Sequence, residues 1–83
     1  MERFEIEFSK SAAKEYKKLP KDYRVLIDLV LSKLTKGMPV DIKPVSGEEN
    51  IYRIRVGKYR ILAIVIEATV VITKIGPRGD VYK

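Results

Sequence analysis

The stretch "YRIRVGKYR", residues 52–60, predicts a β-hairpin around which the rest of the chain can be placed. Gly57-Lys58 is a two-residue connection with glycine first, which is typical of a type II′ turn. Such a turn places Arg55 directly opposite Arg60, and opposed like charges destabilise a strand pair by up to about 1 kcal/mol. Stability alone gives no reason for this pairing, so the pairing indicates a function.

Side-chain alternation gives the predicted hairpin two different faces. Arg53 and Arg55 share one face with Arg60 and Leu62, because successive strand residues point to opposite sides of a sheet. The other face is apolar and aromatic, and we expect it to join the core; its members are Tyr52, Ile54, Val56, Tyr59, Ile61 and Ala63. The sequence therefore predicts an arginine face, defined by Arg53, Arg55 and Arg60, opposite the core face.

The segment before the hairpin predicts one strand and two helices. Residues 3–8 alternate apolar and charged side chains, which is typical of a half-buried strand. Ser9 is the expected N-cap of a short helix that Pro20 ends. A second helix is expected from Pro20 to Lys36, since proline suits a first helical turn. Its apolar stripe is predicted to contain Tyr23, Leu26, Ile27, Val30, Leu31 and Leu34.

The remaining segments complete an α+β fold. Residues 37–50 are expected to form a loop, since Gly37 is a helix stop and glycine and proline recur. Residues 59–66 are apolar on both faces and predict a central strand, and residues 69–75 predict its next partner. The predicted order is β-α-α-β-β-β, a mainly antiparallel sheet with both helices packed on one face. We expect a single domain over residues 1–83.

Composition restricts the partners and the chemistry. The 17 Lys and Arg residues against 11 Asp and Glu give a net charge of +6, which favours a polyanionic partner such as nucleic acid or an acidic protein. The chain has no cysteine and no histidine, which excludes disulfides, thiolate chemistry and a Cys/His zinc site. No segment approaches the roughly 18 apolar residues that span a bilayer. We expect a cytoplasmic protein with no membrane partner.

Two segments, "SGEENIYRIRVGKYRIL" (46–62) and "KIGPRGDVYK" (74–83), resemble the RelE family of bacterial and archaeal toxins. The resemblance covers essentially the whole chain. It implies a compact α+β toxin of a toxin–antitoxin pair that enters the ribosomal A site and cuts mRNA. In that family the ribose 2′-oxygen attacks its own phosphate, which leaves a 2′,3′-cyclic phosphate and a 5′-hydroxyl. No metal or cofactor is implied.

The resemblance also implies catalytic residues. Arg60 and Arg78 match the family's catalytic arginines, Arg53 and Arg55 occupy its two basic strand positions, and Tyr82 matches its C-terminal tyrosine. Guanidinium groups stabilise the charge that develops on a phosphodiester under attack. The family often has lysine at the two strand positions, and arginine cannot act as a general base in its place. Either Tyr82 accepts the proton, with its pKa lowered by nearby cations, or the ribosome orients the 2′-hydroxyl.

Further basic residues and an antitoxin complete the expected contacts. Lysines cluster around the first helix, and such a cluster is usually a solvated surface. Here these lysines, together with the lysine of the hairpin turn, are assigned to RNA binding. The residues are Lys14, Lys17, Lys18, Lys21 and Lys58. Two amphipathic helices and a basic surface suit an extended, acidic, RelB-like antitoxin that folds on binding. The expected partners are therefore this antitoxin, the ribosome and mRNA.

Two other function classes remain open. A ParE-like toxin shares the fold but poisons DNA gyrase and lacks the nuclease cluster. A nonenzymatic nucleic-acid-binding protein or degenerate toxin is favoured if the missing lysine is essential. Taken singly, Arg53 is typical of a solubilising strand residue, Arg78 of a phosphate anchor and Tyr82 of a packed terminus. Retention of Arg60, Arg78 and Tyr82 together favours the nuclease.

Overall fold

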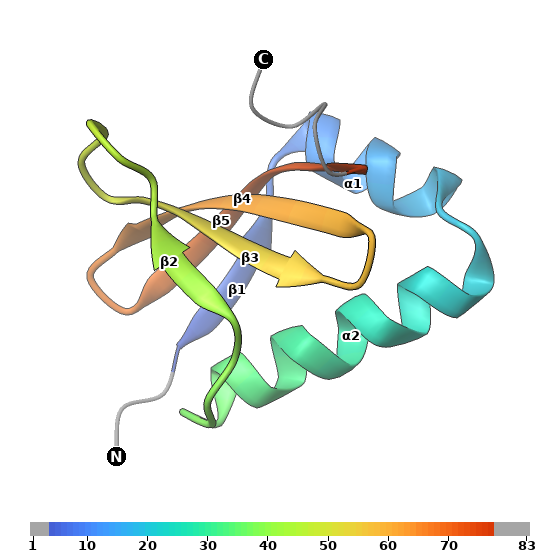
Figure 1. Cartoon of the computed structure of the whole chain (residues 1–83), viewed down its shortest axis with the longest axis horizontal. Coiled ribbons are helices and arrows are strands. Elements are labelled where there is room, and N and C mark those ends of the chain that lie inside the picture. The colour runs from blue at the N-terminus through green and yellow to red at the C-terminus, as the bar shows by residue number, and fades with distance from the viewer. Residues whose placement is uncertain (1–3, 78–83) are drawn as a thin grey trace.

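The computed structural model describes residues 4–77, which form two helices and a five-stranded mixed sheet (Figure 1). The elements in chain order are β1 (Glu5–Phe8), α1 (Lys10–Lys18), α2 (Lys21–Thr35), β2 (Ile42–Pro44), β3 (Ile51–Val56), β4 (Tyr59–Ile66) and β5 (Thr69–Pro77). The strand order is β1-β5-β4-β3-β2, with β1 parallel to β5 and the other pairs antiparallel. The predicted fold class is confirmed, and β2 is an additional strand within the segment expected to be a loop.

The helix boundaries follow the predicted capping residues. Ser9 is the N-cap of α1, and its Oγ accepts a hydrogen bond of 3.1 Å from the backbone N–H of Ala12. The helix ends before Pro20, as predicted. Gly37 follows the end of α2 with φ of +72°, a left-handed conformation that glycine adopts without strain.

The apolar stripe of α2 is narrower than the sequence predicts. Ile27, Leu31 and Leu34 are buried, whereas Tyr23 and Val30 pack only partly against the core. Leu26 is 43% exposed, so its placement in the core stripe was wrong. Leu26 follows directly on Val25, which is also exposed, so it belongs to the outward surface of the helix.

The hairpin has the predicted turn and register. Gly57 has φ of +57°, and Lys58 is not among the described residues with positive φ, which fits a type II′ turn. Val56 lies opposite Tyr59 and Arg55 lies opposite Arg60. The strand β4 is central, with β5 on one side and β3 on the other.

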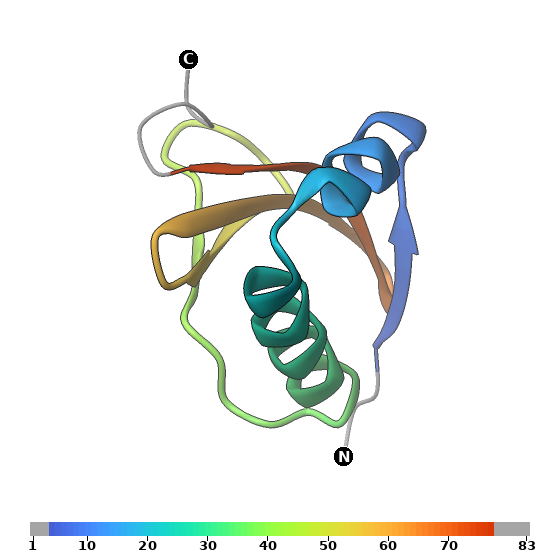
Figure 2. The same ribbon diagram turned by 90° about the vertical axis from the view of Figure 1, so that its right-hand side faces the viewer.

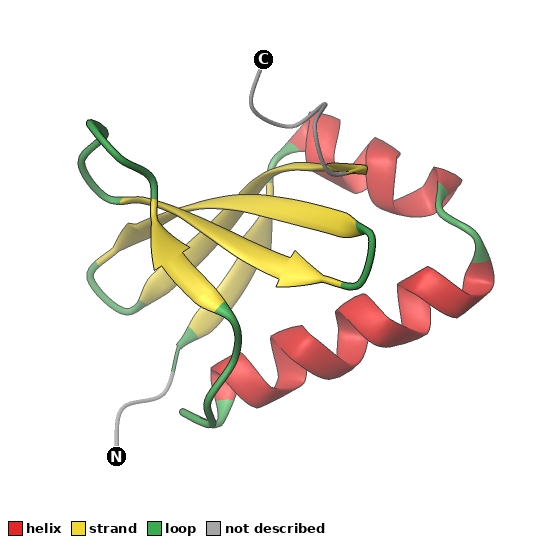
Figure 3. Ribbon diagram, viewed as in Figure 1, coloured by secondary structure: helices red, strands yellow, loops and turns green. Residues whose placement is uncertain are grey.

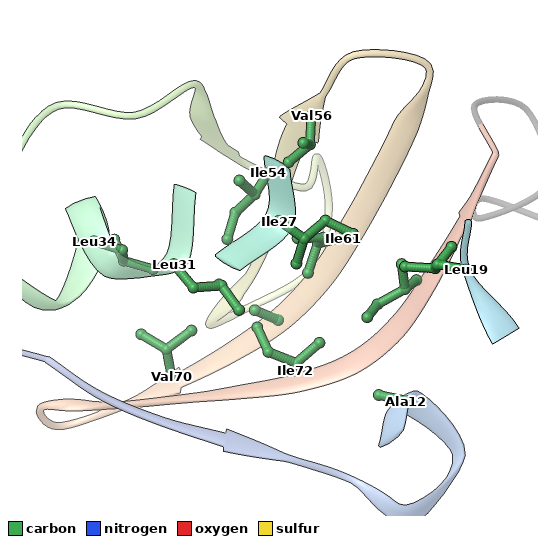
Figure 4. Packing of buried hydrophobic residues seen from close by; sticks show 12 residues of the cluster. Ala12, Leu19, Ile27, Leu31, Leu34, Ile54, Val56, Ile61, Val70 and Ile72 are labelled. Carbon is green, nitrogen blue, oxygen red and sulfur yellow. The ribbon is translucent and has the colours of Figure 1, made fainter. Parts of the chain in front are cut away.

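Both helices lie on one side of the sheet, and the strands arch over α2 (Figure 2). Figure 4 shows how the strand residues Ile54, Ile61 and Ile72 point toward Ile27 and Leu31 of α2. The three strand isoleucines and Ile27 have no exposed surface. Burying such side chains contributes roughly 1.5–3 kcal/mol each, so this contact is the main source of stability. No helix among residues 4–77 is long and apolar enough to cross a membrane.

A β-bulge sets which side chains of β5 leave the core. Leu62 pairs with Lys74 while Ala63 pairs with Ile72, so Thr73 is the extra residue between two pairs. The Thr73 hydroxyl donates a hydrogen bond of 3.2 Å to the Leu62 carbonyl. The bulge shifts the alternation by one residue, which buries Ile75 at 3% exposure and turns Lys74 away from the helices.

Candidate functional site

The sheet face opposite the helices carries a row of residues that begins at Asp41, just before β2, and continues across β3, β4 and β5. Arg55 on β3 lies opposite Arg60 on β4, and Arg60 lies opposite Gly76 on β5. On the other side of Arg55, its backbone N–H donates to the carbonyl oxygen of Asp41 at 2.9 Å. The first row therefore reads Asp41, Arg55, Arg60, Gly76.

A second row lies one step along the strands on the same face. Lys43 pairs with Arg53, Arg53 pairs with Leu62, and Leu62 pairs with Lys74. The two rows together hold five cationic side chains, namely Lys43, Arg53, Arg55, Arg60 and Lys74, and one carboxylate, Asp41. This concentration of positive charge favours the binding of anions at the arginine face.

Asp41 offsets part of the charge repulsion in the first row. Its Oδ2 lies 4.0 Å from Arg55 Nε, and the two side chains are 49% and 37% exposed. An ion pair this long and this exposed contributes less than about 1 kcal/mol. The carboxylate therefore reduces the repulsion between Arg55 and Arg60 without neutralising the face.

Arg53 has a polar atom whose surroundings favour an anionic ligand. Its Nη1 is buried, and it has no hydrogen-bond partner among residues 4–77. A buried donor without an acceptor costs about 1–3 kcal/mol. A phosphate oxygen at this position would relieve that cost.

A hollow of about 480 Å³ lies beside Arg53 and Arg60. Its other lining residues are Pro44, Val45 and Ser46, which end β2 and begin the loop to β3. We call it the arginine hollow. The loop that borders it extends past the end of the sheet (Figure 3). The hollow brings cationic and apolar side chains together in one place.

The predicted catalytic residues fall into two groups. Arg53, Arg55 and Arg60 lie together on the arginine face, as predicted. Arg78 and Tyr82 lie outside the described residues, so their assignment stays a prediction.

The predicted RNA-binding lysines are not on the arginine face. Lys14, Lys17 and Lys18 are exposed on α1, and Lys21 is exposed at the start of α2, which places all four in the helical layer. Lys58 is exposed in the turn next to the Arg55/Arg60 pair. The lysines of α1 and α2 therefore form a separate basic surface, and only Lys58 adjoins the arginines.

Asp41 and Lys43 belong to the arginine face but were missing from the prediction. Residues 40–43 alternate apolar and charged side chains, which is a strand signal. Pro39 and Pro44 enclose this segment and leave it very short, which is more typical of a loop. An edge strand tolerates proline, and the alternation predicts a strand here, but it does not predict that this strand pairs with β3.

A second surface feature lies between the two helices and β1. Tyr16 Oη donates a hydrogen bond of 2.6 Å to Asp28 Oδ1, and this bond raises the pKa of Tyr16, with burial and the negative charge of Asp28 adding to the effect. The ring of Tyr16 also makes an edge contact with Phe8, with ring centroids 5.6 Å apart. These residues line a mostly apolar pocket of about 340 Å³ with Ala13, Lys17 and Leu31.

Comparison with known proteins places the chain among toxins. The family model described as "ParE toxin of type II toxin-antitoxin system, parDE" matches residues 6–82. The chain is similar to Toxin RelE3 of Methanocaldococcus jannaschii, with 34% identity over 80 residues that cover 90% of this chain and 91% of that protein. A protein named RelE1 of the same organism is 31% identical over 87 residues, covering 98% of this chain and 97% of its own length.

A solved structure agrees with these sequence similarities. The crystal structure of the RelB-RelE antitoxin-toxin complex from Methanococcus jannaschii contains a chain that matches this fold with a TM-score of 0.80. The two chains are 31% identical, and the match covers 92% of this chain and 94% of the other.

Proposed function

The chain belongs to the RelE/ParE superfamily of toxins of type II toxin–antitoxin systems, and from that premise we propose that it is a ribosome-dependent endoribonuclease that cuts mRNA in the A site. The observation that carries this proposal is the pairing of Arg55 with Arg60, next to Arg53, on an open sheet face. A toxin that acted only through an apolar protein contact would have no use for this concentration of positive charge. An RNA phosphate does require it.

The chemistry follows from what guanidinium groups can do. In the proposed reaction the 2′-oxygen attacks the adjacent phosphorus, the bond to the 5′-oxygen breaks, and the 5′-oxygen takes up a proton. Arg60 and Arg78 stabilise the negative charge on the phosphate oxygens, and Arg53 and Arg55 hold the phosphates on either side. Tyr82 accepts the proton of the 2′-hydroxyl. This scheme uses no metal and no cofactor.

The relatives favour a RelE-like ribonuclease over a ParE-like gyrase poison. The matching family model carries the name of the ParE toxin, which keeps a ParE-like gyrase poison as the second candidate. The curated relatives with 31% and 34% identity are both named RelE. The arginine face adds a physical reason, since a phosphodiester in an active site needs such cations.

We propose that a RelB-like antitoxin binds the helical layer. Val25, Leu26 and Leu29 are 58%, 43% and 52% exposed on the outer surface of α2, which is more apolar surface than an unpartnered helix usually shows. The exposed lysines of α1 and Lys21 border this surface, and they favour an acidic partner. We propose a cytoplasmic location, because the proposed action requires ribosomes.

Cleavage of mRNA on purified ribosomes tests the proposed function. The protein is incubated with programmed ribosomes, and the 5′ ends of the fragments are mapped at codon resolution. We expect cuts at the A-site codon that leave a 2′,3′-cyclic phosphate. The rate should stay the same when EDTA is added in an amount that leaves enough Mg²⁺ to keep the ribosome intact. A parallel gyrase supercoiling assay provides the contrast. Inhibited gyrase with intact mRNA would favour the ParE-like candidate, and binding without either effect would favour a nonenzymatic protein.

The role of Tyr82 has its own test. If Tyr82 accepts the proton, single-turnover cleavage should rise with pH in the native protein, and Tyr82→Phe should remove that rise while ribosome binding stays nearly unchanged. Equal rates for both proteins across the pH range would assign proton removal to the ribosome or to a lysine near the arginine face.

A further inference from the structure

We propose that the arginine hollow is a binding subsite for one nucleotide of the RNA, with its phosphate on Arg53 and its base against Pro44 and Val45. This inference rests on the proposed ribonuclease function and specifies where part of the substrate lies. It concerns binding and positioning, and it assigns no step of the reaction to the loop residues.

The floor of the hollow is suited to a phosphate. Arg53 and Arg60 both line it, and both are half-buried, which strengthens their interaction with an anion compared with fully solvated side chains. The buried Nη1 of Arg53 has no acceptor among the described residues. Lys43 lies opposite Arg53 on the same face and adds a further positive charge. A phosphate is the part of a nucleotide that these groups select.

The wall of the hollow is suited to a base. Pro44 and Val45 present apolar surface next to the arginines, and Ser46 adds a hydroxyl that can donate or accept a hydrogen bond. A nucleobase has an apolar face and a polar edge, so it can pack on the first two residues while its edge reaches the third. The volume of about 480 Å³ is within the ~300–1,000 Å³ range of small-ligand sites.

The loop that forms this wall is held in place by backbone hydrogen bonds. Val45 N–H donates to the Ile51 carbonyl at 2.8 Å, and Glu48 N–H donates to the Val45 carbonyl at 3.2 Å. At the other end of the loop, Val65 N–H on β4 donates to the Asn50 carbonyl at 2.9 Å. Because the loop is tied to both neighbouring strands, a nucleotide can bind with little ordering of the wall.

Titration of the isolated protein with adenosine 3′-monophosphate, followed by backbone amide NMR signals, tests the subsite. Signals of Val45, Ser46 and Arg53 should shift saturably with the nucleotide. Inorganic phosphate, followed by the Arg53 signal, should bind at least tenfold more weakly than the nucleotide. Adenosine should cause no saturable shift of the Arg53 signal. Equal affinities for phosphate and for the nucleotide would overturn the base contact. Shifts confined to the helical layer would overturn the whole inference.

Matched variants separate a contact from a general charge effect. Val45→Asp should weaken nucleotide binding at least tenfold, because it places a carboxylate where the phosphate and base meet. Met38→Asp introduces the same carboxylate at a 48% exposed position after α2, outside the hollow, and should leave binding within twofold. Ser46→Ala, an exposed position with little effect on folding, should weaken binding severalfold. Unchanged binding in both hollow variants would overturn the proposal.

The outcomes for this subsite and for the proposed function are distinguishable. Cleavage on ribosomes with no nucleotide-induced shift at the hollow would reject the subsite and leave the ribonuclease in place. Saturable shifts at the hollow without any ribosomal cleavage would support the subsite and reject the ribonuclease.

Discussion

The two faces of the β3–β4 hairpin are built from neighbouring residues of the same strands, yet they serve opposite purposes. Ile54 pairs with Ile61 on the helix side, and neither has exposed surface. One residue further along, Arg55 pairs with Arg60 on the open side. The backbone is the same for both pairs, so only the side chains decide that one pair stabilises the fold and the other opposes it. The opposing pair fits the anionic partner proposed for this face.

The largest expected effect on folding comes from the helix side of this comparison. Ile54→Ala removes a fully buried side chain from the contact with α2, and it should lower the free energy of unfolding by about 2–5 kcal/mol. Urea unfolding measures the loss. Ile66→Ala is the matched control, because Ile66 is 57% exposed on β4 and should change stability by less than about 0.5 kcal/mol.

Ribosomal cleavage by the Ile54→Ala protein completes that prediction. Activity per folded molecule should remain close to that of the native protein, since Ile54 points away from the arginine face. If the fully folded Ile54→Ala protein lost much of its cleavage activity, the core side chain would affect the function of the arginine face.

Arg60→Ala tests the open side of the sheet. It should reduce cleavage strongly while changing stability little. Cleavage should fall about a hundredfold or more if Arg60 stabilises charge in the transition state. Stability should change by no more than about 1 kcal/mol, because a cross-strand repulsion is lost. Single-turnover cleavage and urea unfolding on the same preparation measure both quantities. Preserved cleavage with a clear loss of stability would make Arg60 a structural residue.

Most of the helix side was predictable from the sequence, and the reason is local. Ser9 acts through its own side chain, and Pro20 and Gly37 act through their backbone conformation, so the helix ends could be predicted without the fold. The Gly57 turn likewise fixes the pairing of Arg55 with Arg60.

The parts that were not predictable depend on contacts between distant segments. Asp41 joins the arginine face only because β2 pairs with β3, which the short segment between two prolines does not indicate by itself. The Thr73 bulge turns Lys74 to the same face, and simple alternation cannot reveal it. The exposure of Leu26 depends on which surface of α2 meets the sheet. Each of these features is a tertiary property that periodicity leaves open.

Asp41→Asn sharpens the comparison within the open side. Loss of the carboxylate removes the charge that offsets Arg55, so stability should fall by less than about 1 kcal/mol. Affinity for a single-stranded RNA should rise severalfold at low salt, and the gain should shrink as added salt screens the charges. Fluorescence anisotropy across a salt series measures it. Glu49→Gln is the control, since it removes a carboxylate from the adjoining loop; an equal gain there would mean that net charge alone is responsible.

The smallest expected effect concerns Tyr16 and Asp28 on the helix side, which are hydrogen-bonded to each other. Arg53 Nη1 on the open side, by contrast, has no partner among the described residues. Tyr16 donates to Asp28 at 2.6 Å, and this bond raises the pKa of Tyr16 above its ordinary value. The folded state therefore holds the phenol proton more tightly than the unfolded chain does. The resulting stabilisation is fully present below the unfolded pKa of about 10 and is lost as pH rises through the higher folded pKa.

Tyr16→Phe should consequently lower the free energy of unfolding by about 0.5–1 kcal/mol at pH 8, where the hydrogen bond is intact on a largely exposed pair. The difference between Tyr16→Phe and the native protein should shrink as the pH is raised beyond 10, because the native protein then loses the same bond. Urea unfolding at a series of pH values measures both curves. Since Phe keeps the ring contact with Phe8, only the hydroxyl is tested. A difference that stays constant through the titration would mean that packing, not the bond to Asp28, is what Tyr16 contributes to the helical layer.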